Sequence, residues 1–439
     1  MISQLLFLLL LSTGIFFFAR RIGIIRRNIK SGRDWDGSDR IAERLAMMAR
    51  VALGQGKMTA RPVAGAMHIL IYAGFVIINI EMLEILIDGV FGTHRVFAFL
   101  GPLYDFLIAS FEWLAAGVLL ACVVFFIRRN GMAIARLASN DLKGWPSLDA
   151  NIILVVEILL MFAFLSMNAA DAIAQSRGLD HYVSAGSFPV SSCLIPLYAG
   201  LTDSGVVFVE RGMWWFHIAG VLAFLVYVPY SKHFHILLAF PNTYYSNLNP
   251  SGQMDNMAAV KKEVDLMMDP NADPFAAAPE SAEPPAPFGV KDAMDLTWKQ
   301  LLEAYTCTEC GRCTSECPAN NTGKLLSPRK IMMSTRNRIE EIGQKREANG
   351  GQWTSDGKSL IGDWITEAEL WACTSCQACV EACPINISPM GIILDMRRSL
   401  IMEDSKSPES ITSMFNNIEN NGAPWAFSSG SRGDWIQEV

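Results

Sequence analysis

Long apolar stretches alternate with polar loops over the first 240 residues of the chain. A helix needs roughly 20 mainly apolar residues to cross a bilayer, and five stretches meet this requirement. The polar sequence that follows has helical periodicity at 328–348 and 366–371 and no alternating strand pattern. The pattern therefore predicts a mainly α fold, with a five-helix transmembrane bundle and a separate α-helical domain. The five expected spans are residues 2–19, 68–90, 97–127, 152–173 and 213–240.

Lysine and arginine are divided unequally between the loops. The loop 20–61 contains eleven of them and the loop 128–143 four, whereas the alternate loops contain only Arg95, Arg177 and Arg211. Because cytoplasmic loops are enriched in these residues, the N-terminus is expected outside and everything after the fifth helix in the cytoplasm. The first apolar stretch has no basic residue before it and no small-x-small cleavage site, so we expect a retained anchor rather than a signal peptide.

Composition divides the rest of the chain. Residues 267–290 are rich in proline, alanine and acidic residues, which is typical of a flexible linker. The net charge of -7, without a long basic stripe, argues against a nucleic-acid partner. The expected organisation is a membrane domain at 1–245, a linker at 246–290, a soluble domain at 291–405 and a docking tail at 406–439.

Eight of the ten cysteines form two copies of the pattern C-x2-C-x2-C-x3-C-P. In this pattern three closely spaced thiolates bind one [4Fe-4S] cluster and the fourth binds the other cluster. Disulfides have no reason to repeat this spacing, and structural zinc normally takes pairs of cysteines. Cys122 and Cys193 belong to neither copy. The expected ligand sets are Cys307, Cys310, Cys313 and Cys383 for one cluster, and Cys373, Cys376, Cys379 and Cys317 for the other.

Histidines in the apolar stretches suggest haem iron as a second redox centre. His217 and His235 are 18 residues apart in the predicted fifth helix, which is five turns or about 27 Å on one face; His233 falls on another face. His68, at the cytoplasmic start of the second helix, is expected at the depth of His235. Imidazole is a common haem ligand and histidine is costly in lipid, so His68 and His235 are predicted to bind one haem b.

Carboxylates also occur within the predicted spans. A charged group in a span is a functional candidate, because its burial costs several kcal/mol unless it is paired, hydrated or neutral. Glu81, Glu84 and Glu112 are expected in the outer half of the membrane with His217, where they would form a proton-conducting quinone pocket. The alternative is that some line a hydrated surface or the headgroup boundary.

Five helices, the two histidines 18 residues apart and the segment SKHFHILLAFPN at 231–242 resemble the cytochrome b subunit of respiratory nitrate reductases. With the two cysteine quartets, the chain resembles membrane-bound iron-sulfur reductases of the heterodisulfide reductase type. The resemblance implies His68 and His235 as ligands of the cytoplasmic-side haem, and His217 as one ligand of an outer haem. That family has a second histidine where this chain has Ile78, so either Met82 replaces it or His217 belongs to the quinone pocket.

The resemblance implies an electron-transfer subunit of the bacterial inner membrane that connects a menaquinone-type quinone, haem b and two [4Fe-4S] clusters. Larger family members carry cysteine-rich CCG repeats with the catalytic cluster, and no such repeat occurs here. A separate cytoplasmic catalytic subunit with these repeats is therefore expected. The alternatives are a membrane anchor or assembly scaffold for a redox complex, and a ferredoxin-linked oxidoreductase that does not use quinone.

Overall fold

The computed structural model describes residues 1–271 and 287–437, and the regular secondary structure of these residues is helical, without any strand. Five helices are long and apolar enough to cross a membrane, as predicted. Pro62 and Pro102 are the first residues of two of them, where the missing N–H of proline costs no helical hydrogen bond. The five are α1 (Ile2–Ile29), α3 (Pro62–Phe91), α4 (Pro102–Asn130), α5 (Trp145–Ser176) and α7 (Asp203–Tyr227).

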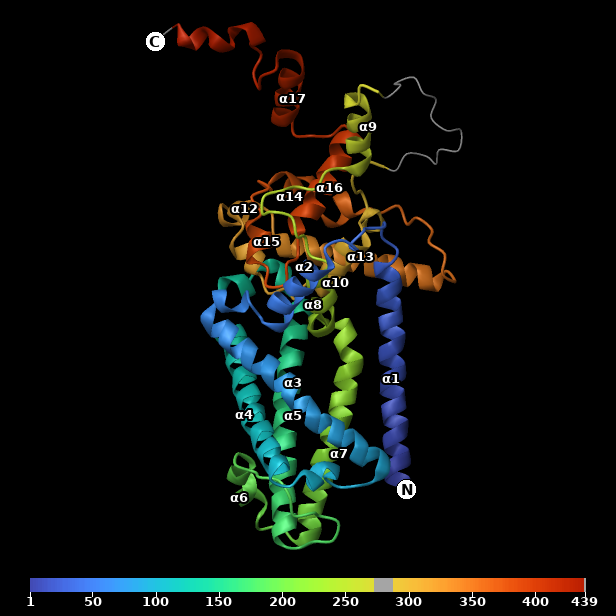
Figure 1. Ribbon diagram of the computed structural model, residues 1–439, viewed down its shortest axis with the longest axis vertical. Coiled ribbons are helices and arrows are strands. Elements are labelled where there is room, and N and C mark those ends of the chain that lie inside the picture. The colour runs from blue at the N-terminus through green and yellow to red at the C-terminus, as the bar shows by residue number, and fades with distance from the viewer. Residues whose placement is uncertain (272–286, 438–439) are drawn as a thin grey trace.

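The C-terminal domain lies on one end of this helical bundle, and the N-terminus lies at the other end (Figure 1). Both basic loops contact the domain. Arg61 forms an ion pair with Glu316 at 2.9 Å, and Arg136 donates a hydrogen bond to the carbonyl oxygen of Cys310 at 2.6 Å. The basic loops and the chain after α7 therefore share one side, which is the relative arrangement that the loop charges predicted.

The helix that contains His217 ends earlier than expected, which corrects the prediction of one continuous helix to residue 240. Helix α7 ends at Tyr227 and is followed by a 3-10 turn at Val228–Tyr230, which contains Pro229. Ser231 is extended (ψ 161°), and a second 3-10 turn leads into α8 (His235–Tyr244). His217 and His235 therefore do not share one helix face.

The C-terminal domain is a set of short helices around one long helix, α13 (Pro328–Ala348). Its apolar core is continuous with the membrane part, because Ile25, Val228 and Phe234 belong to the same buried cluster as Leu301 and Ile331. The α-helices of the described residues that have not yet been given are α2 (Ile41–Met48), α6 (Ile195–Tyr198), α9 (Ala258–Met268), α10 (Trp298–Thr306), α11 (Arg312–Ser315), α12 (Pro318–Asn321), α14 (Glu367–Trp371), α15 (Ala378–Ala382), α16 (Pro389–Met402) and α17 (Glu409–Asn421).

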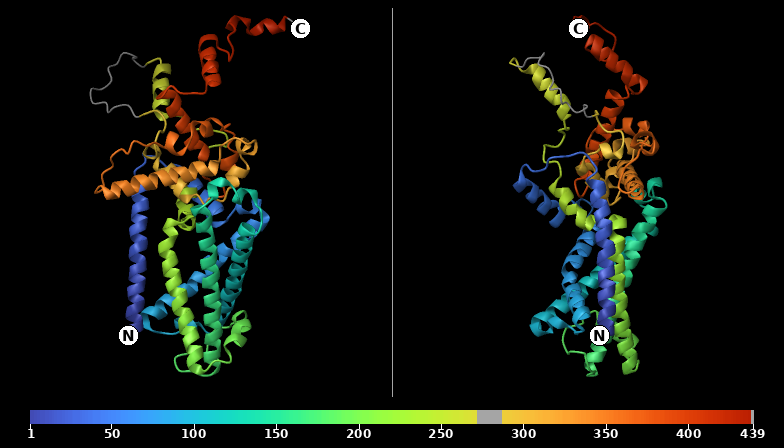
Figure 2. Two further views of the ribbon diagram at one scale, coloured as in Figure 1. Left: turned by 180° about the vertical axis from the view of Figure 1, so that it is seen from behind. Right: turned by 90° about the vertical axis from the view of Figure 1, so that its right-hand side faces the viewer.

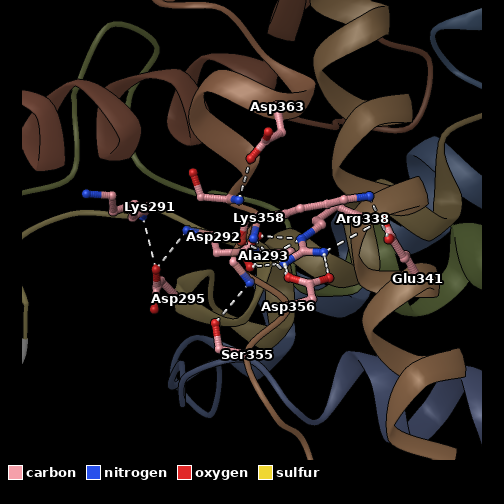
Figure 3. Close-up of polar contacts among 12 residues, drawn as sticks. Lys291, Asp292, Ala293, Asp295, Arg338, Glu341, Ser355, Asp356, Lys358 and Asp363 are labelled. Carbon is pink, nitrogen blue, oxygen red and sulfur yellow. Dashed lines mark hydrogen bonds and ion pairs between the residues drawn. The ribbon is translucent and has the colours of Figure 1, made fainter. Parts of the chain in front are cut away.

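A buried arginine fixes the first residues of this domain to α13 (Figure 3). Arg338 is fully buried and donates hydrogen bonds to Asp292 (2.6 Å) and Asp356 (2.7 Å). Asp292 also accepts the backbone N–H of Ala293 at 2.8 Å. One guanidinium thus connects the start of the domain, α13 and the loop that follows α13.

The region predicted as a linker is partly structured. Gly252 donates its N–H to Gln377 at 3.3 Å, Arg398 donates a hydrogen bond to the carbonyl oxygen of Asp255, and α9 follows. The proline-rich remainder, 272–286, lies outside the described residues. The predicted tail contains α17, which has no buried residue and extends away from the domain (Figure 1).

Asp141, in the loop between α4 and α5, holds the domain against the bundle. It accepts hydrogen bonds from Arg329 (2.6 Å), which is 1% exposed, and from Ser327 (2.9 Å). Burial alone would raise the pKa of Asp141, but hydrogen bonds from Arg329 and Ser139 outweigh it and hold the pKa below its ordinary value. The carboxylate is therefore ionised and neutralises a buried guanidinium.

Asp141→Asn should lower the free energy of unfolding of the C-terminal domain by about 3–5 kcal/mol, because it leaves the buried Arg329 charge without its carboxylate. Thermal unfolding of the purified full chain measures the effect. Asp265→Asn is the control, since Asp265 pairs with Lys261 on an exposed helix surface and such pairs contribute less than about 1 kcal/mol. Equal melting temperatures of the two variants would contradict the assignment.

Candidate metal centres

The first candidate centre is a pocket lined by cysteines from both motifs. Cys307, Cys310 and Cys313 line it together with Cys383 of the second motif; Cys379 also reaches its wall. Cys307 and Cys310 lie between α10 and α11, where Gly311 has a positive φ of 73° and reverses the backbone, and Cys313 lies in α11. The pocket thus contains all four cysteines of the first predicted ligand set.

The second candidate centre gathers the other four cysteines. Burial raises the pKa of Cys373 and of Cys379, and Cys317 and Cys376 are close enough to raise the pKa of both further, so the four thiols lie near one another. Arg397 donates hydrogen bonds to the carbonyl oxygens of Leu370 and Cys373 beside them. Cys376 is exposed, whereas Cys307 and Cys317 are buried. Within the second centre, Cys376 is therefore the cysteine that is open to solvent.

The buried thiols are suited to metal binding rather than to free thiolate chemistry. Burial raises the pKa of Cys307 to about 12 and the pKa of Cys383 to about 11. A metal ligand must be deprotonated, and a bound cation supplies the positive charge that makes a buried thiolate stable. The donor set of four cysteines in a buried pocket fits a [4Fe-4S] cluster.

The third candidate centre is a pair of imidazoles between α3 and α8. The ring centroids of His68 and His235 are 6.3 Å apart. Two imidazoles on opposite sides of one metal ion, with metal–nitrogen bonds of about 2.0–2.1 Å, have ring centroids about 6 Å apart. The Nδ1 atom of His68 is buried without a hydrogen-bond partner among the described residues, whereas Nδ1 of His235 lies 3.1 Å from the carbonyl oxygen of Lys232. That contact leaves Nε2 of His235 as the free ligand atom.

His233 lies close to this pair, contrary to the expectation that it would point away. Its ring centroid is 5.7 Å from that of His235 and 5.5 Å from that of Phe224. The break after α7 explains the difference, because residues 232–234 form a 3-10 turn instead of continuing an α-helix.

Lys232 connects the imidazole pair to the first cysteine pocket. Its carbonyl oxygen contacts His235, and its ammonium group forms an ion pair with Glu309, which lines the pocket between Cys307 and Cys310. Arg336 donates a second hydrogen bond to Glu309 at 2.7 Å. Burial alone would raise the pKa of Glu309, but Arg336 and Lys232 outweigh it and lower the pKa.

A polar network is buried at the other end of the bundle. Arg95 donates hydrogen bonds to Asp171 (2.6 Å), Tyr104 (3.0 Å) and Asn168 (3.1 Å). Tyr104 in turn donates to Glu84 at 2.8 Å, and Asn168 to Glu112 at 3.1 Å. The structure thus brings two of the predicted carboxylates, Glu84 and Glu112, into one network.

The three predicted carboxylates differ in their environments. Glu84 accepts the N–H of Phe97 at 2.8 Å, and Glu112 accepts the N–H groups of Val190 and Ser191, so both also fix loop backbone. Glu81 is 3% exposed, and its Oε2 atom has no hydrogen-bond partner among the described residues. Glu81 is therefore the carboxylate of this group that is available to a ligand.

His217 occupies a different place in the bundle. It is buried in α7, with Nδ1 3.0 Å from the carbonyl oxygen of Leu160 and its ring 6.0 Å from that of Phe164. These contacts are with α5, and within the described residues no hydrogen bond joins His217 to Glu81, Glu84 or Glu112.

Sequence reasoning missed Arg95, Asp171 and Lys232. Arg95 was counted only as a loop charge, although it is 7% exposed. The signal for Asp171 was present, because an acidic residue at the end of an apolar stretch requires a partner. Lys232 offered no such signal, since its contacts join segments 77 residues apart.

Comparisons with known proteins agree with the cysteine centres. A family model described as a 4Fe-4S dicluster domain matches residues 306–387. The chain is 27% identical, over its full length, to a probable iron-sulfur-binding oxidoreductase, FadF, of Bacillus subtilis, of which it covers 61%. It is 28% identical, over 91% of its length, to the EtfAB:quinone oxidoreductase of Syntrophomonas wolfei, of which it covers 55%. No solved structure matches significantly.

A shorter relative is one subunit of the ferredoxin/F(420)H(2)-dependent CoB-CoM heterodisulfide reductase of Methanosarcina acetivorans. It is 31% identical over 27% of this chain and 60% of its own length.

The chain spans about three fifths of the length of the Bacillus subtilis and Syntrophomonas wolfei relatives, which it matches over most of its own sequence. It contains a 4Fe-4S dicluster domain next to five apolar, membrane-length helices, and its relatives are iron-sulfur oxidoreductases.

Proposed function

We propose that the chain is a membrane electron-transfer subunit that connects a membrane quinone, one haem b and two [4Fe-4S] clusters with a catalytic partner. The proposal rests on one observation, which is that the His68–His235 pair lies next to the first cysteine pocket. Lys232 contacts both sites, and Arg312, which lines the pocket, is close enough for its charge to act on His68. Haem and clusters would each take up and release one electron at a time.

The residues of the chain fit haem ligation at this position. Nδ1 of His235 contacts the Lys232 carbonyl oxygen at 3.1 Å, and this contact fixes both the tautomer and the ring orientation. The buried Nδ1 of His68 has no partner among the described residues, so this ring is not committed to another hydrogen bond. His68 and His235 would therefore hold the haem iron. A second haem at His217 is not part of the proposal.

A quinone site at the other end of the bundle would complete the path. Glu81 is buried, lacks a partner at Oε2 and lies within range of the charge of Arg95, so it is positioned to exchange a proton with a bound quinone. Glu84 and Glu112 would hold the surrounding loops in place. The Syntrophomonas wolfei relative is an EtfAB:quinone oxidoreductase, which supports the same class of substrate here. His217, against α5, would line the inner part of this site.

Electrons would leave the chain through the second cysteine centre, where Cys376 is exposed. The tail beyond it presents large apolar side chains to solvent, among them Phe415, Trp425 and Phe427, and such exposed groups are typical of interaction surfaces. We propose that residues 406–439 bind a cytoplasmic catalytic partner that carries CCG-type repeats. The membrane domain at 1–245 and cluster domain at 291–405 would then lie in and under the bacterial inner membrane, with the N-terminus outside.

Absorbance of the purified full chain tests the function. The reduced protein should show b-type haem bands as well as cluster absorbance, and a menaquinone analogue should reoxidise both. Clusters without haem would favour a membrane anchor or scaffold. Haem that does not respond to quinone would favour a ferredoxin-linked oxidoreductase without quinone.

Glu81→Gln should slow the reoxidation by quinone roughly 100-fold without loss of haem or clusters, because positioned proton transfer contributes about that factor or more. Stopped-flow absorbance measures the rate. Glu157→Gln is the matched control, since Glu157 is also a carboxylate within a membrane-length helix but lies near Cys122. Equal rates for wild type and Glu81→Gln would remove Glu81 from the quinone site.

A further inference from the structure

A basic groove lies where α1 leaves the apolar part of the bundle and meets the end of α13. It is open to solvent and has a volume of about 1020 Å³. Five cationic side chains line it, together with one carboxylate, Glu347, which forms an ion pair with Arg27. The cations are Arg20, Arg26, Arg27, Lys30 and Arg346.

Most of this charge is not neutralised within the described part of the chain. No ion pair to Arg20, Arg26, Lys30 or Arg346 occurs there; Arg346 has only a long hydrogen bond of 3.5 Å to Asn28. Cations that line one groove repel one another, and an anion bound between them offsets this repulsion. The groove therefore has the charge of an anion-binding site.

The groove lies at the depth of lipid headgroups. Arg20 follows Ile2 by 18 residues, or about 27 Å along a helix, which is close to the ~30 Å thickness of the hydrocarbon core. Arg20, Gly23, Arg27 and Lys30 recur at intervals of three or four residues and so form one stripe on α1. The stripe starts where the apolar part of the helix ends.

Below the groove, α1 exposes a large apolar surface. Only 11% of its most apolar stretch is buried, and Ile15, Phe16 and Phe17 are at least 47% exposed. Helix α1 stands upright at one side of the bundle, with α13 crossing its upper end (Figure 2). A ligand with an anionic head and long apolar chains matches both parts of this surface.

The crossing of α1 and α13 is fixed by close contacts. A Cβ atom at Gly343 would lie 2.4 Å from the side-chain oxygen of Asn28, so a larger residue at this position would displace the Asn28 side chain. Arg21 donates a hydrogen bond to Glu340 at 2.8 Å, and Asn28 donates one to Tyr305 at 2.9 Å. The walls of the groove are therefore held in place without a ligand.

We propose that this groove binds the headgroup of an anionic phospholipid, whose acyl chains lie along the exposed face of α1. Basic pockets between helices on the cytoplasmic side of membrane proteins bind such headgroups. The lipid would bridge α1 and α13 and so join the membrane bundle to the cluster domain. The site is distinct from the redox centres and does not depend on the proposed function.

Binding of phosphatidylglycerol to the purified, delipidated full chain tests the proposal. The combined variant Arg26→Gln, Lys30→Gln and Arg346→Gln should weaken binding roughly 100-fold, because each cation near an anionic lipid contributes about a fivefold factor. Cluster absorbance reports whether the variant has folded. The matched control, Lys143→Gln, Lys262→Gln and Lys324→Gln, removes three cations outside the groove and should bind like wild type.

Two further arms separate the possible ligands. Phosphatidylcholine should bind at least tenfold more weakly than phosphatidylglycerol. Inorganic phosphate at 10 mM, which is on the order of ten times the dissociation constant of a weak anion site, should not displace the lipid. Equal binding of the two lipids, equal loss in both variants, or full displacement by phosphate would each overturn the lipid site, the last in favour of a free-anion site.

Discussion

Cys383→Ala is expected to destroy the cluster held by the first cysteine motif, although Cys383 belongs to the second motif. Cys383 lines the same pocket as Cys307, Cys310 and Cys313. Removal of one of four thiolates leaves an open iron position, so iron and acid-labile sulfide should fall by about half. Chemical analysis and electron paramagnetic resonance of the reduced protein measure the loss.

The reciprocal variant and a control make this result specific. Cys317→Ala should remove the other cluster, whose remaining ligands are Cys373, Cys376 and Cys379. Cys193→Ala should retain both clusters, because Cys193 is exposed and lies outside the motifs. If Cys383→Ala left the first cluster intact and removed the second, the crossed ligation would be wrong.

The parts of the structure that the sequence predicted depend on short-range patterns. A span of about 20 apolar residues determines a membrane helix by itself, and the cysteine spacing indicates the dicluster domain because three of the four ligands of each cluster lie within a few residues of one another. The position of Cys383 in the same pocket as the first motif agrees with the repeated pattern, and its role as a ligand there stays a prediction. The five helices and the helical cluster domain were therefore foreseen.

The break between α7 and α8 was not foreseen, because it depends on a balance of local and distant contacts. Pro229 lacks the N–H that would continue the helix, and the Ser231 hydroxyl accepts the N–H of His233 instead. The buried ion pair of Lys232 with Glu309 then requires the chain to turn toward the cluster domain. Apolar residues continue through this region, so hydropathy alone predicts one uninterrupted helix.

The network around Arg95 was missed for a related reason. Arg95 and Asp171 are 76 residues apart in the sequence, and neither position shows that the other lies beside it. A loop arginine is usually solvated, whereas Arg95 is buried against α5, which contains Asp171, and α3, which contains Glu84. Long-range pairing of buried charges is set by the packing of helices rather than by periodicity.

The break also changes which histidine variants are informative. On one continuous helix His233 would lie on another face than His235, and its replacement would report only on structure. In the structure His233 lies 5.7 Å from His235, so it shares the surroundings of the proposed ligand without being paired with His68. It is therefore the most stringent control for the assignment of the haem ligands.

His68→Ala and His235→Ala should each abolish haem binding, while His233→Ala should retain it. The reason is that either substitution removes one of the two imidazole ligands that would bind the haem iron. The b-type absorbance bands of the purified chain measure haem, and cluster absorbance should be unchanged in all three variants. Full haem content in His68→Ala would show that the imidazole pair has another role.

The backbone carbonyl of Lys232 orients His235, while the Lys232 ammonium group pairs with Glu309. Lys232→Met should therefore retain haem but slow electron transfer to the first cluster.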